Sequence, residues 1–256
     1  MAVSKNQRAV LTGAAGGIGR EIAKALMAQC AQLILVGRNR AALEALRSQL
    51  DADKVHIVDG DLTQSATLER IVRIGDTLGG IDLLVNNAGN NDFHAFETQS
   101  PDVIRSMMEI NLIAPMLLSR ALIPLLKRAS RAQIVNIGSV MGGIGFPGYA
   151  AYCASKSGLY GFSQALRREL ADTTIDVRYF APRATRTAIN GDAAVAMNRE
   201  LKTAEDAPED VAHAFVDFLN GRARERTLGG KESFFVFVNR IFPGLPERAI
   251  RNQLGI

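Results

Sequence analysis

The octapeptide Thr12-Gly13-Ala14-Ala15-Gly16-Gly17-Ile18-Gly19 joins a short apolar run, residues 9–11, to an amphipathic helical pattern over residues 18–29. The first backbone N–H groups of a helix have no partner within the helix and carry partial positive charge. Glycines let an anion approach these groups closely. The stretch therefore predicts a phosphate-binding turn formed by Gly13, Gly17, Ile18 and Gly19, rather than an ordinary strand–helix turn.

Short, almost entirely apolar runs alternate with helical patterns along the chain. The runs, each typical of a strand buried on both faces of a parallel sheet, cover residues 9–11, 33–36, 55–58, 83–85, 134–137 and 177–180. The helical patterns cover residues 18–29, 40–50, 65–78, 101–128 and 149–170. This alternation predicts a single α/β domain over residues 1–256, with a doubly wound, Rossmann-type parallel sheet and helices on both faces.

Composition argues against several other classes of protein. The chain has two cysteines without a CxxC motif and three histidines that are not paired at ligand spacing, so we expect neither a disulfide scaffold nor a metal site. The net charge of +4 comes from scattered basic residues, which does not favour nucleic-acid binding but suits an anionic cofactor. We expect no transmembrane segment, because no apolar stretch reaches about 18 residues. Residues 1–8 are polar, which favours a cytoplasmic location.

A second functional pattern lies far downstream of the glycines. Tyr152 and Lys156 are four residues apart in a helical pattern, which places them on one face. A lysine cation near a tyrosine is expected to lower the phenol pKa and make it a general acid and base for a carbonyl oxygen. Ser139 follows the run 134–137, where its hydroxyl could orient that carbonyl. Together with the glycine turn, these residues predict hydride transfer with a nicotinamide cofactor; the alternative for the pair is a helical surface contact.

Asn111 lies within the helical pattern that Ser100 caps and Pro101 opens. Pro115, four residues later, has no N–H to donate to the carbonyl of Asn111, so the helix is expected to kink there. The freed carbonyl would bind a water that extends a proton path from Lys156 to solvent. A kink that serves only packing is the alternative.

The end of the second strand distinguishes between nicotinamide cofactors. Enzymes that use NAD place a carboxylate about 20 residues beyond the glycines, where it accepts hydrogen bonds from the ribose. This chain has Gly37-Arg38-Asn39-Arg40 there instead. Arg38 is suited to pair with a 2′-phosphate, so NADP(H) is predicted and NAD is less favoured; a solvated arginine at a helix start is the alternative.

These residues resemble the compact branch of the short-chain dehydrogenase/reductase family, over residues 8–190. The resemblance implies that residues 12–19 bind the cofactor and that Asn86-Asn87-Ala88-Gly89, through Asn87, Ala88 and Gly89, line its adenosine side. It also implies that Asp61, with Leu62 beside it, faces the adenine. The family's catalytic set falls on Asn111, Ser139, Tyr152 and Lys156. Arg38 matches members that prefer NADP, and members commonly form homodimers or homotetramers through the helices at 101–128 and 149–170.

Two segments depart from the family pattern. After the sixth strand the family usually has Pro-Gly and then a threonine, whereas this chain has Pro182-Arg183-Ala184-Thr185-Arg186-Thr187. In the substrate loop region, residues 183–205, Thr185 and Thr187 are expected to contact the nicotinamide end. Arg183 either steers an anionic group of the substrate or faces solvent.

The second departure is the apolar extension at residues 232–256. Its segment 234–242 holds 4 of the chain's 11 phenylalanines, and a short helix is expected from residue 246. The favoured interpretation is that this segment covers the core or forms a subunit interface. A lid over an apolar substrate, or a shallow contact with a membrane surface, is the sharper hypothesis.

The predicted function is NADP(H)-dependent interconversion of a ketone or aldehyde and an alcohol. The expected small-molecule substrate is apolar or acyl-type, with 3-oxoacyl thioesters, apolar ketones and small aldehydes as candidates. A non-catalytic dinucleotide sensor or scaffold is an alternative, but such a protein would be expected to lack Tyr152 or Lys156. A sugar-nucleotide epimerase is another, but about 60 residues follow Asn190, too few for its usual substrate domain.

Overall fold

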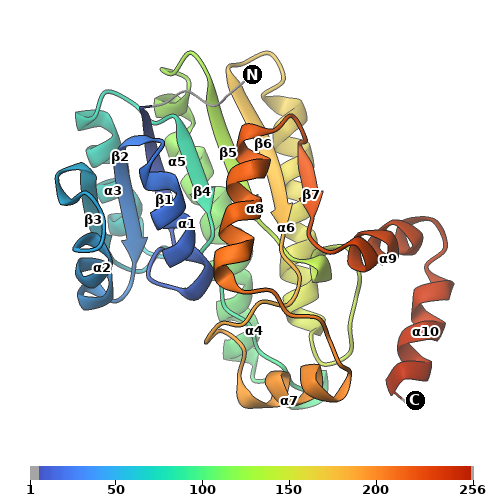
Figure 1. Cartoon of the computed structure of the whole chain (residues 1–256). Coiled ribbons are helices and arrows are strands. Elements are labelled where there is room, and N and C mark those ends of the chain that lie inside the picture. Colours follow the sequence, from blue (N-terminus) through green and yellow to red (C-terminus); the bar gives the residue numbers. More distant parts are fainter. Residues whose placement is uncertain (1–5, 255–256) are drawn as a thin grey trace.

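Seven parallel strands form one sheet in the order β3-β2-β1-β4-β5-β6-β7 in a computed structural model that describes residues 6–254 (Figure 1). The strands are β1 (Gln7–Thr12), β2 (Cys30–Gly37), β3 (Val55–Asp59), β4 (Leu83–Asn86), β5 (Ala132–Ile137), β6 (Ile175–Ala181) and β7 (Glu225–Thr227). The strand order reverses between β1 and β4. Ligands of open α/β sheets bind in the crevice at such a switch point, outside the carboxyl ends of the strands.

Helices cover both faces of the sheet, as the alternation of runs predicts (Figure 1). One face carries α1 (Gly17–Met27), α2 (Arg40–Arg47) and α8 (Pro208–Asn220). The other carries α3 (Ser65–Thr77), α5 (Ala114–Leu126) and α6 (Ala150–Glu169). The remaining helices are α4 (Pro101–Met108), α7 (Asp192–Glu200), α9 (Gly230–Ile241) and α10 (Gly244–Leu254).

Each central strand contributes to two hydrophobic cores. Leu11 of β1 packs with Ile22 of α1 and Phe215 of α8, while the adjacent Val10 packs with Leu118 of α5 on the opposite face. All five of these side chains are essentially inaccessible to solvent. Because successive side chains of a strand point to opposite faces and both faces are covered, the strands read as continuous apolar runs instead of alternating ones.

The long helical pattern at residues 101–128 is not one regular helix. It consists of α4, a π-helical turn at Glu109–Ile113 and α5, and it ends at Leu126. The N–H of Ala114 donates to the carbonyl of Glu109, five residues back, so one extra residue is accommodated in the turn. The irregularity therefore falls at Asn111, as expected, but it is a π-helical turn, and Pro115 lies in the first turn of α5.

One helical segment has the length and mean composition of a membrane-spanning helix, although polar residues such as Asn111 and Arg120 interrupt its apolar stretch. Among the residues the structure describes, the helical segment Pro101–Leu126 passes by length and composition, with a mean hydropathy of 1.5. Its apolar side chains Leu118, Leu122 and Leu125 are buried against the sheet. The apolar character of this segment thus reflects its place in the core.

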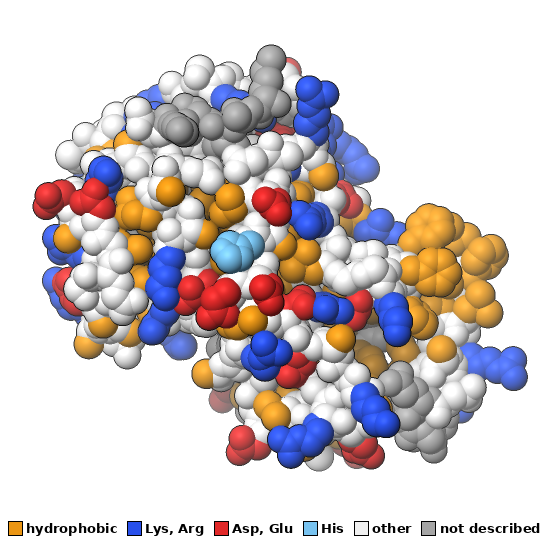
Figure 2. Space-filling view, in the orientation of Figure 1, with side chains coloured by type: hydrophobic (Ala, Val, Ile, Leu, Met, Phe, Trp, Pro, Cys, Tyr) orange, Lys and Arg blue, Asp and Glu red, His pale blue; other side chains and the backbone are white. Residues whose placement is uncertain are grey.

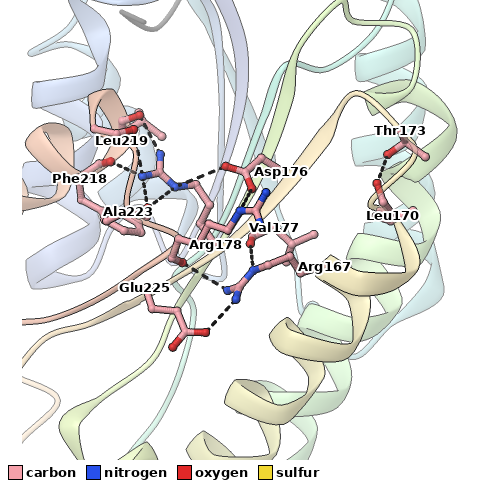
Figure 3. A network of polar contacts seen from close by, with 12 residues as sticks. Arg167, Leu170, Thr173, Asp176, Val177, Arg178, Phe218, Leu219, Ala223 and Glu225 are labelled. Carbon is pink, nitrogen blue, oxygen red and sulfur yellow. Dashed lines mark hydrogen bonds and ion pairs between the residues drawn. The ribbon is translucent and has the colours of Figure 1, made fainter. Parts of the chain in front are cut away.

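Strand β7 and helices α7, α8 and α9 are absent from the elements that the sequence predicted. A buried arginine of β6 holds the end of α8 and the loop after it (Figure 3). Arg178 is 1% exposed, and its guanidinium donates to the carbonyls of Phe218 and Leu219 at the end of α8 and to that of Ala223. It also stacks on the Phe218 ring, 4.1 Å from its centre. Arg178 therefore adds donors to the carbonyls at the end of α8, where the N–H of Gly221 also bonds Phe218, and attaches this helix to the sheet.

Candidate active site

The glycine turn is held against the end of β4. Gly13 has φ of +64°, and a Cβ at this position would lie 2.8 Å from the Cα of Ala88, so only glycine fits without strain. The hydroxyl of Thr12 accepts from the backbone N–H groups of Asn87 (2.9 Å) and Ala88 (3.0 Å). The side chain of Asn87 returns a hydrogen bond to the carbonyl of Thr12 (3.0 Å). Residues from two distant parts of the chain thus form one rim of the crevice.

The start of α1 has the properties of an anion site. Its first residue is Gly17, its N-cap is Gly16, no side chain caps it, and its first turn carries no acidic residue. Both glycines are exposed, so the first N–H groups of the helix can be reached from solvent. Thr187 lies directly against Gly17, since a Cβ there would be 2.6 Å from its Cγ2. These residues fit the pyrophosphate of a dinucleotide, with Thr187 at the edge of the same site.

The end of β2 presents a basic surface. Arg38 is exposed there. On the adjacent strand, Asp59 lies beside Gly37 in the ladder, but its carboxylate accepts from Arg70 (2.9 Å) and Arg40 (3.4 Å). The hydrogen bond from Arg70 holds the pKa of Asp59 below its usual value. The acid at this strand end is therefore neutralised by two arginines, and Arg38 remains available for an anion.

Asp61 and Leu62 differ in their surroundings. Asp61 is exposed, and its carboxylate accepts from the N–H and the hydroxyl of Thr63, both at 2.9 Å. Leu62 is 6% exposed and its side chain packs in the core. Asp61 thus stabilises the turn before α3, and only the backbone of Leu62 is left for a ligand.

Tyr152 and Ser139 meet at the carboxyl end of β5. Tyr152 lies in the first turn of α6 and is partly exposed, and its hydroxyl lies near the side chain of Ser139. The Oγ of Ser139 also accepts from the N–H of Met141 (3.1 Å) and so caps the short helical turn Val140–Gly142. The hydroxyl of Tyr179 accepts from the Ser139 N–H (3.4 Å) behind this turn. The Ser139 side chain is fixed where it can reach a group bound to Tyr152.

Lys156 and Asn111 complete the cluster beneath Tyr152. The Nζ of Lys156 donates to the carbonyl of Ile137 (3.0 Å) and lies 5.8 Å from the centre of the Tyr152 ring. A Cβ at Gly89 would lie 2.9 Å from Oδ1 of Asn111 and 3.6 Å from this Nζ, so the three residues are neighbours. The structure therefore brings together all four residues predicted as the catalytic set.

Burial sets the pKa values of the two titratable groups. Loss of hydration raises the pKa of Tyr152 to about 12, although the nearby Ser139 side chain opposes this shift. Burial lowers the pKa of Lys156 to about 8. In the chain by itself the pKa of Tyr152 is therefore raised overall, because desolvation of the phenolate outweighs the stabilisation by Ser139.

Asn111 acts through its side chain in the structure. It is fully buried, its Oδ1 accepts from the N–H of Asn90 (2.8 Å), and its Nδ2 donates to the carbonyl of Asn90 (2.9 Å) and to Ser155 (3.0 Å). Ser155 in turn donates to the carbonyl of Tyr152 (2.8 Å). Sequence reasoning missed both partners. The place of Ser155 beside Lys156 was an available signal, whereas Asn90 uses only its backbone and leaves none.

Apolar side chains surround Tyr152 on its open side. Tyr149 packs on Phe93, with ring centres 4.9 Å apart, and lies 6.1 Å from the Tyr152 ring. Met141, Phe146, Cys153, Ala194 and Met197 belong to the same cluster. Ala194 and Met197 come from α7, so part of the predicted substrate loop region lies next to Tyr152. The wall of the site is apolar.

Arg183 neither faces solvent nor remains free to attract an anion. Its guanidinium pairs with Asp206 (2.6 Å) and with Glu232 of α9 (3.4 Å). Thr185 is 6% exposed, and its hydroxyl donates to the carbonyl of Arg183 (3.0 Å). Both sequence-based alternatives for Arg183 are corrected: its charge is neutralised by two carboxylates, and it ties the loop after β6 to α9.

Comparison with known proteins agrees with this geometry. A family model described as short chain dehydrogenase matches residues 7–198. Dehydrogenase/reductase SDR family member 7B of Bos taurus is 31% identical over 257 residues, covering 94% of this chain and 79% of the relative. Nodulation protein G of a Rhizobium species is 38% identical over 177 residues, covering 69% of this chain and 72% of the relative.

Solved structures share the fold. A short-chain dehydrogenase from Streptomyces avermitilis superposes with a TM-score of 0.82 at 26% identity, covering 99% of this chain and 98% of that one. A short-chain dehydrogenase/reductase from Burkholderia phymatum, solved in complex with NAD, has a TM-score of 0.85 at 21% identity, covering 95% of this chain and 96% of that one. At that identity the likeness concerns the fold alone.

Proposed function

The chain belongs to the short-chain dehydrogenase/reductase family of oxidoreductases, and we propose that it interconverts a ketone or aldehyde and an alcohol with NADP(H). The observation that carries the proposal is the grouping of Tyr152, Ser139 and Asn111 around the buried Lys156, which lies 5.8 Å from the centre of the Tyr152 ring. This cluster lies on the strand ends that also carry the glycine turn.

Catalysis follows from what each side chain can donate. When bound, the reduced dinucleotide supplies a hydride to the carbonyl carbon. Tyr152 donates its hydroxyl proton to the carbonyl oxygen, and Ser139 stabilises the negative charge that develops there. Lys156, mostly protonated at pH 7 because its pKa is about 8, stabilises the resulting phenolate of Tyr152. Asn111 positions this part of α6 through Ser155.

A preference for NADP(H) over NAD(H) is supported by the basic end of β2. Asp59 is engaged by Arg40 and Arg70, so no free carboxylate at this strand end opposes a 2′-phosphate near Arg38. A guanidinium binds phosphate through two parallel hydrogen bonds, which a ribose hydroxyl cannot match.

An apolar carbonyl compound is the proposed substrate class. The cluster of Phe93, Met141, Phe146 and Met197 beside Tyr152 supports it, because apolar walls bind apolar substrates by excluding water. The neutralised Arg183 does not favour an anionic head group. A cytoplasmic location and assembly into dimers or tetramers, as is common in the family, complete the proposal.

The proposal is tested by following NADPH and NADH oxidation with a panel of apolar ketones, 3-oxoacyl thioesters and small aldehydes. We expect turnover with at least one apolar ketone and a higher kcat/KM with NADPH. Tyr152→Phe should lower kcat by about 10² or more while NADPH still binds, because only the proton donor is removed. Tight NADPH binding without turnover in either protein would instead support a non-catalytic sensor.

A further inference from the structure

Two polar residues of helix α9 face the body of the protein. Glu232 pairs with Arg183, and Asn239 donates to the carbonyl of Gly143 (3.0 Å). Val236, between them on the same side, is 7% exposed and packs directly on Gly143, where a Cβ would lie 2.6 Å from its Cγ1. The inner side of α9 therefore contacts the body through two polar side chains and one valine.

The opposite side of α9 is apolar and exposed. Phe234, Phe237 and Ile241 follow the i, i+3, i+7 spacing of one helix face and are 64%, 59% and 52% exposed. Phe242 and Leu245, in the turn toward α10, are 60% and 61% exposed. We call these five residues the outer α9 face. Figure 2 shows hydrophobic side chains gathered in this part of the molecule, and Figure 1 shows α9 and α10 projecting from the body.

Core packing does not explain such a helix. A helix that only covers a core turns its apolar stripe inward, whereas the large apolar side chains of α9 are exposed, beside the exposed charges of Lys231 and Arg240. Large apolar side chains that are exposed together mark a surface that binds something else. The occupant therefore has to be sought outside the folded chain.

Charge at the edges of the outer α9 face identifies the occupant. Lys231, Arg240 and Arg248 are exposed around it, and Arg240 lies over the ring of Tyr160, 4.8 Å from its centre. Of the acidic residues in α9 and α10, Glu232 is turned inward to Arg183, which leaves Glu247. A second copy related by a two-fold axis would bring equal basic groups together, which is unfavourable. An anionic surface complements them.

We propose that the outer α9 face docks on the surface of an anionic lipid bilayer. Phenylalanine, isoleucine and leucine side chains enter the boundary between headgroups and acyl chains, while basic side chains at the edge contact lipid phosphates. This inference does not depend on the proposed oxidoreductase reaction, because it uses none of the residues of the Tyr152 cluster.

A single tryptophan reports on docking, because the chain has none. Phe237→Trp places the probe in the outer α9 face, and Phe96→Trp, at a phenylalanine that is 61% exposed, is the matched control. Vesicles of phosphatidylserine and phosphatidylcholine should shift the emission of the first variant to the blue and protect it from iodide, and leave the second unchanged. Equal responses of both variants, or no response of either, would overturn the proposal.

Co-sedimentation of the full chain measures the affinity. We expect binding to anionic vesicles, weak binding to pure phosphatidylcholine, and a loss of about tenfold or more when Phe234, Phe237 and Ile241 are replaced by Ser. The control replaces the exposed Phe96 by Ser and should bind like the parent. Circular dichroism and NADPH binding verify that each variant is folded.

Two outcomes contradict lipid docking. Binding that is insensitive to salt and to the double change Lys231→Glu and Arg248→Glu would remove the role of charge. A fall in particle mass by light scattering in the Phe-to-Ser variant, with no vesicle binding by the parent, would make the outer α9 face an interface between copies instead.

Discussion

Replacing Lys156 by methionine removes a buried cation while keeping most of the side-chain volume. The side chain is 5% exposed, and its pKa is lowered from 10.5 to about 8. Since one pKa unit corresponds to about 1.36 kcal/mol, the ammonium destabilises the folded chain by about 3 kcal/mol when fully protonated. Its hydrogen bond to Ile137, lost in the variant, contributes about 1 kcal/mol in the other direction.

The sign of the pH dependence follows from proton binding. Between pH 8 and 10.5 the folded state binds fewer protons at Lys156 than the unfolded state, so the free energy of unfolding rises with pH in this window. The penalty is complete below pH 8 and absent above 10.5. The Lys156→Met variant should therefore be more stable than the parent by about 2 kcal/mol at pH 7 and less stable by about 1 kcal/mol near pH 10.5.

Urea unfolding followed by circular dichroism, at one protein concentration and several pH values from 7 to 10.5, measures this difference. The variant should also have no measurable turnover, so that stability and activity move in opposite directions at neutral pH. Lys24→Met is the control, because Lys24 is exposed and only pairs with Glu21 on α1. A stability difference between the Lys156 variant and the parent that does not change with pH would refute the reasoning.

Three further changes test other parts of the site. Gly13→Ala should destabilise the chain by about 1–3 kcal/mol in thermal unfolding, because φ is +64° and the Cβ meets Ala88, and a loss no larger than that of Gly145→Ala would contradict this. Arg38→Ser should raise the KM for NADPH about tenfold or more and leave that for NADH nearly unchanged; equal effects would show that Arg38 does not read a 2′-phosphate. Asn239→Ala should lower stability by about 1 kcal/mol and reduce kcat more than it changes KM, because Gly143 ends the turn that carries Ser139; an unchanged kcat would show that α9 does not position this turn.

Local sequence was sufficient for the strands that lie in the middle of the sheet. Their side chains are buried on both faces, which selects apolar runs that are easily recognised. Strand β7 was missed because Glu225-Arg226-Thr227 is a short, polar edge strand without such a run. Helix α8 did carry signals, with Pro208 in its first turn, acidic residues beside it and a buried apolar stripe, and it could have been predicted.

The residues of the candidate site were recognisable because each has a fixed place relative to an element. The glycines follow β1, Ser139 follows β5, and Tyr152 and Lys156 share one face of α6. Other features depend on residues that are distant in sequence. Arg183 finds Asp206 and Glu232, and Asn111 finds Asn90, only after the loops are placed.

The sequence by itself determined the doubly wound sheet, the anion-binding turn and the positions of Tyr152 and Lys156, because all of these arise from periodicity and from contacts between near neighbours along the chain. Only the tertiary structure decided how strongly these groups are buried. Burial raises the pKa of Tyr152 and lowers that of Lys156. The packing of α9 against the rest of the chain leaves its phenylalanines exposed. The hydration of a side chain depends on all the groups packed around it. Many of these groups come from segments distant in sequence, so a local sequence pattern does not predict the hydration.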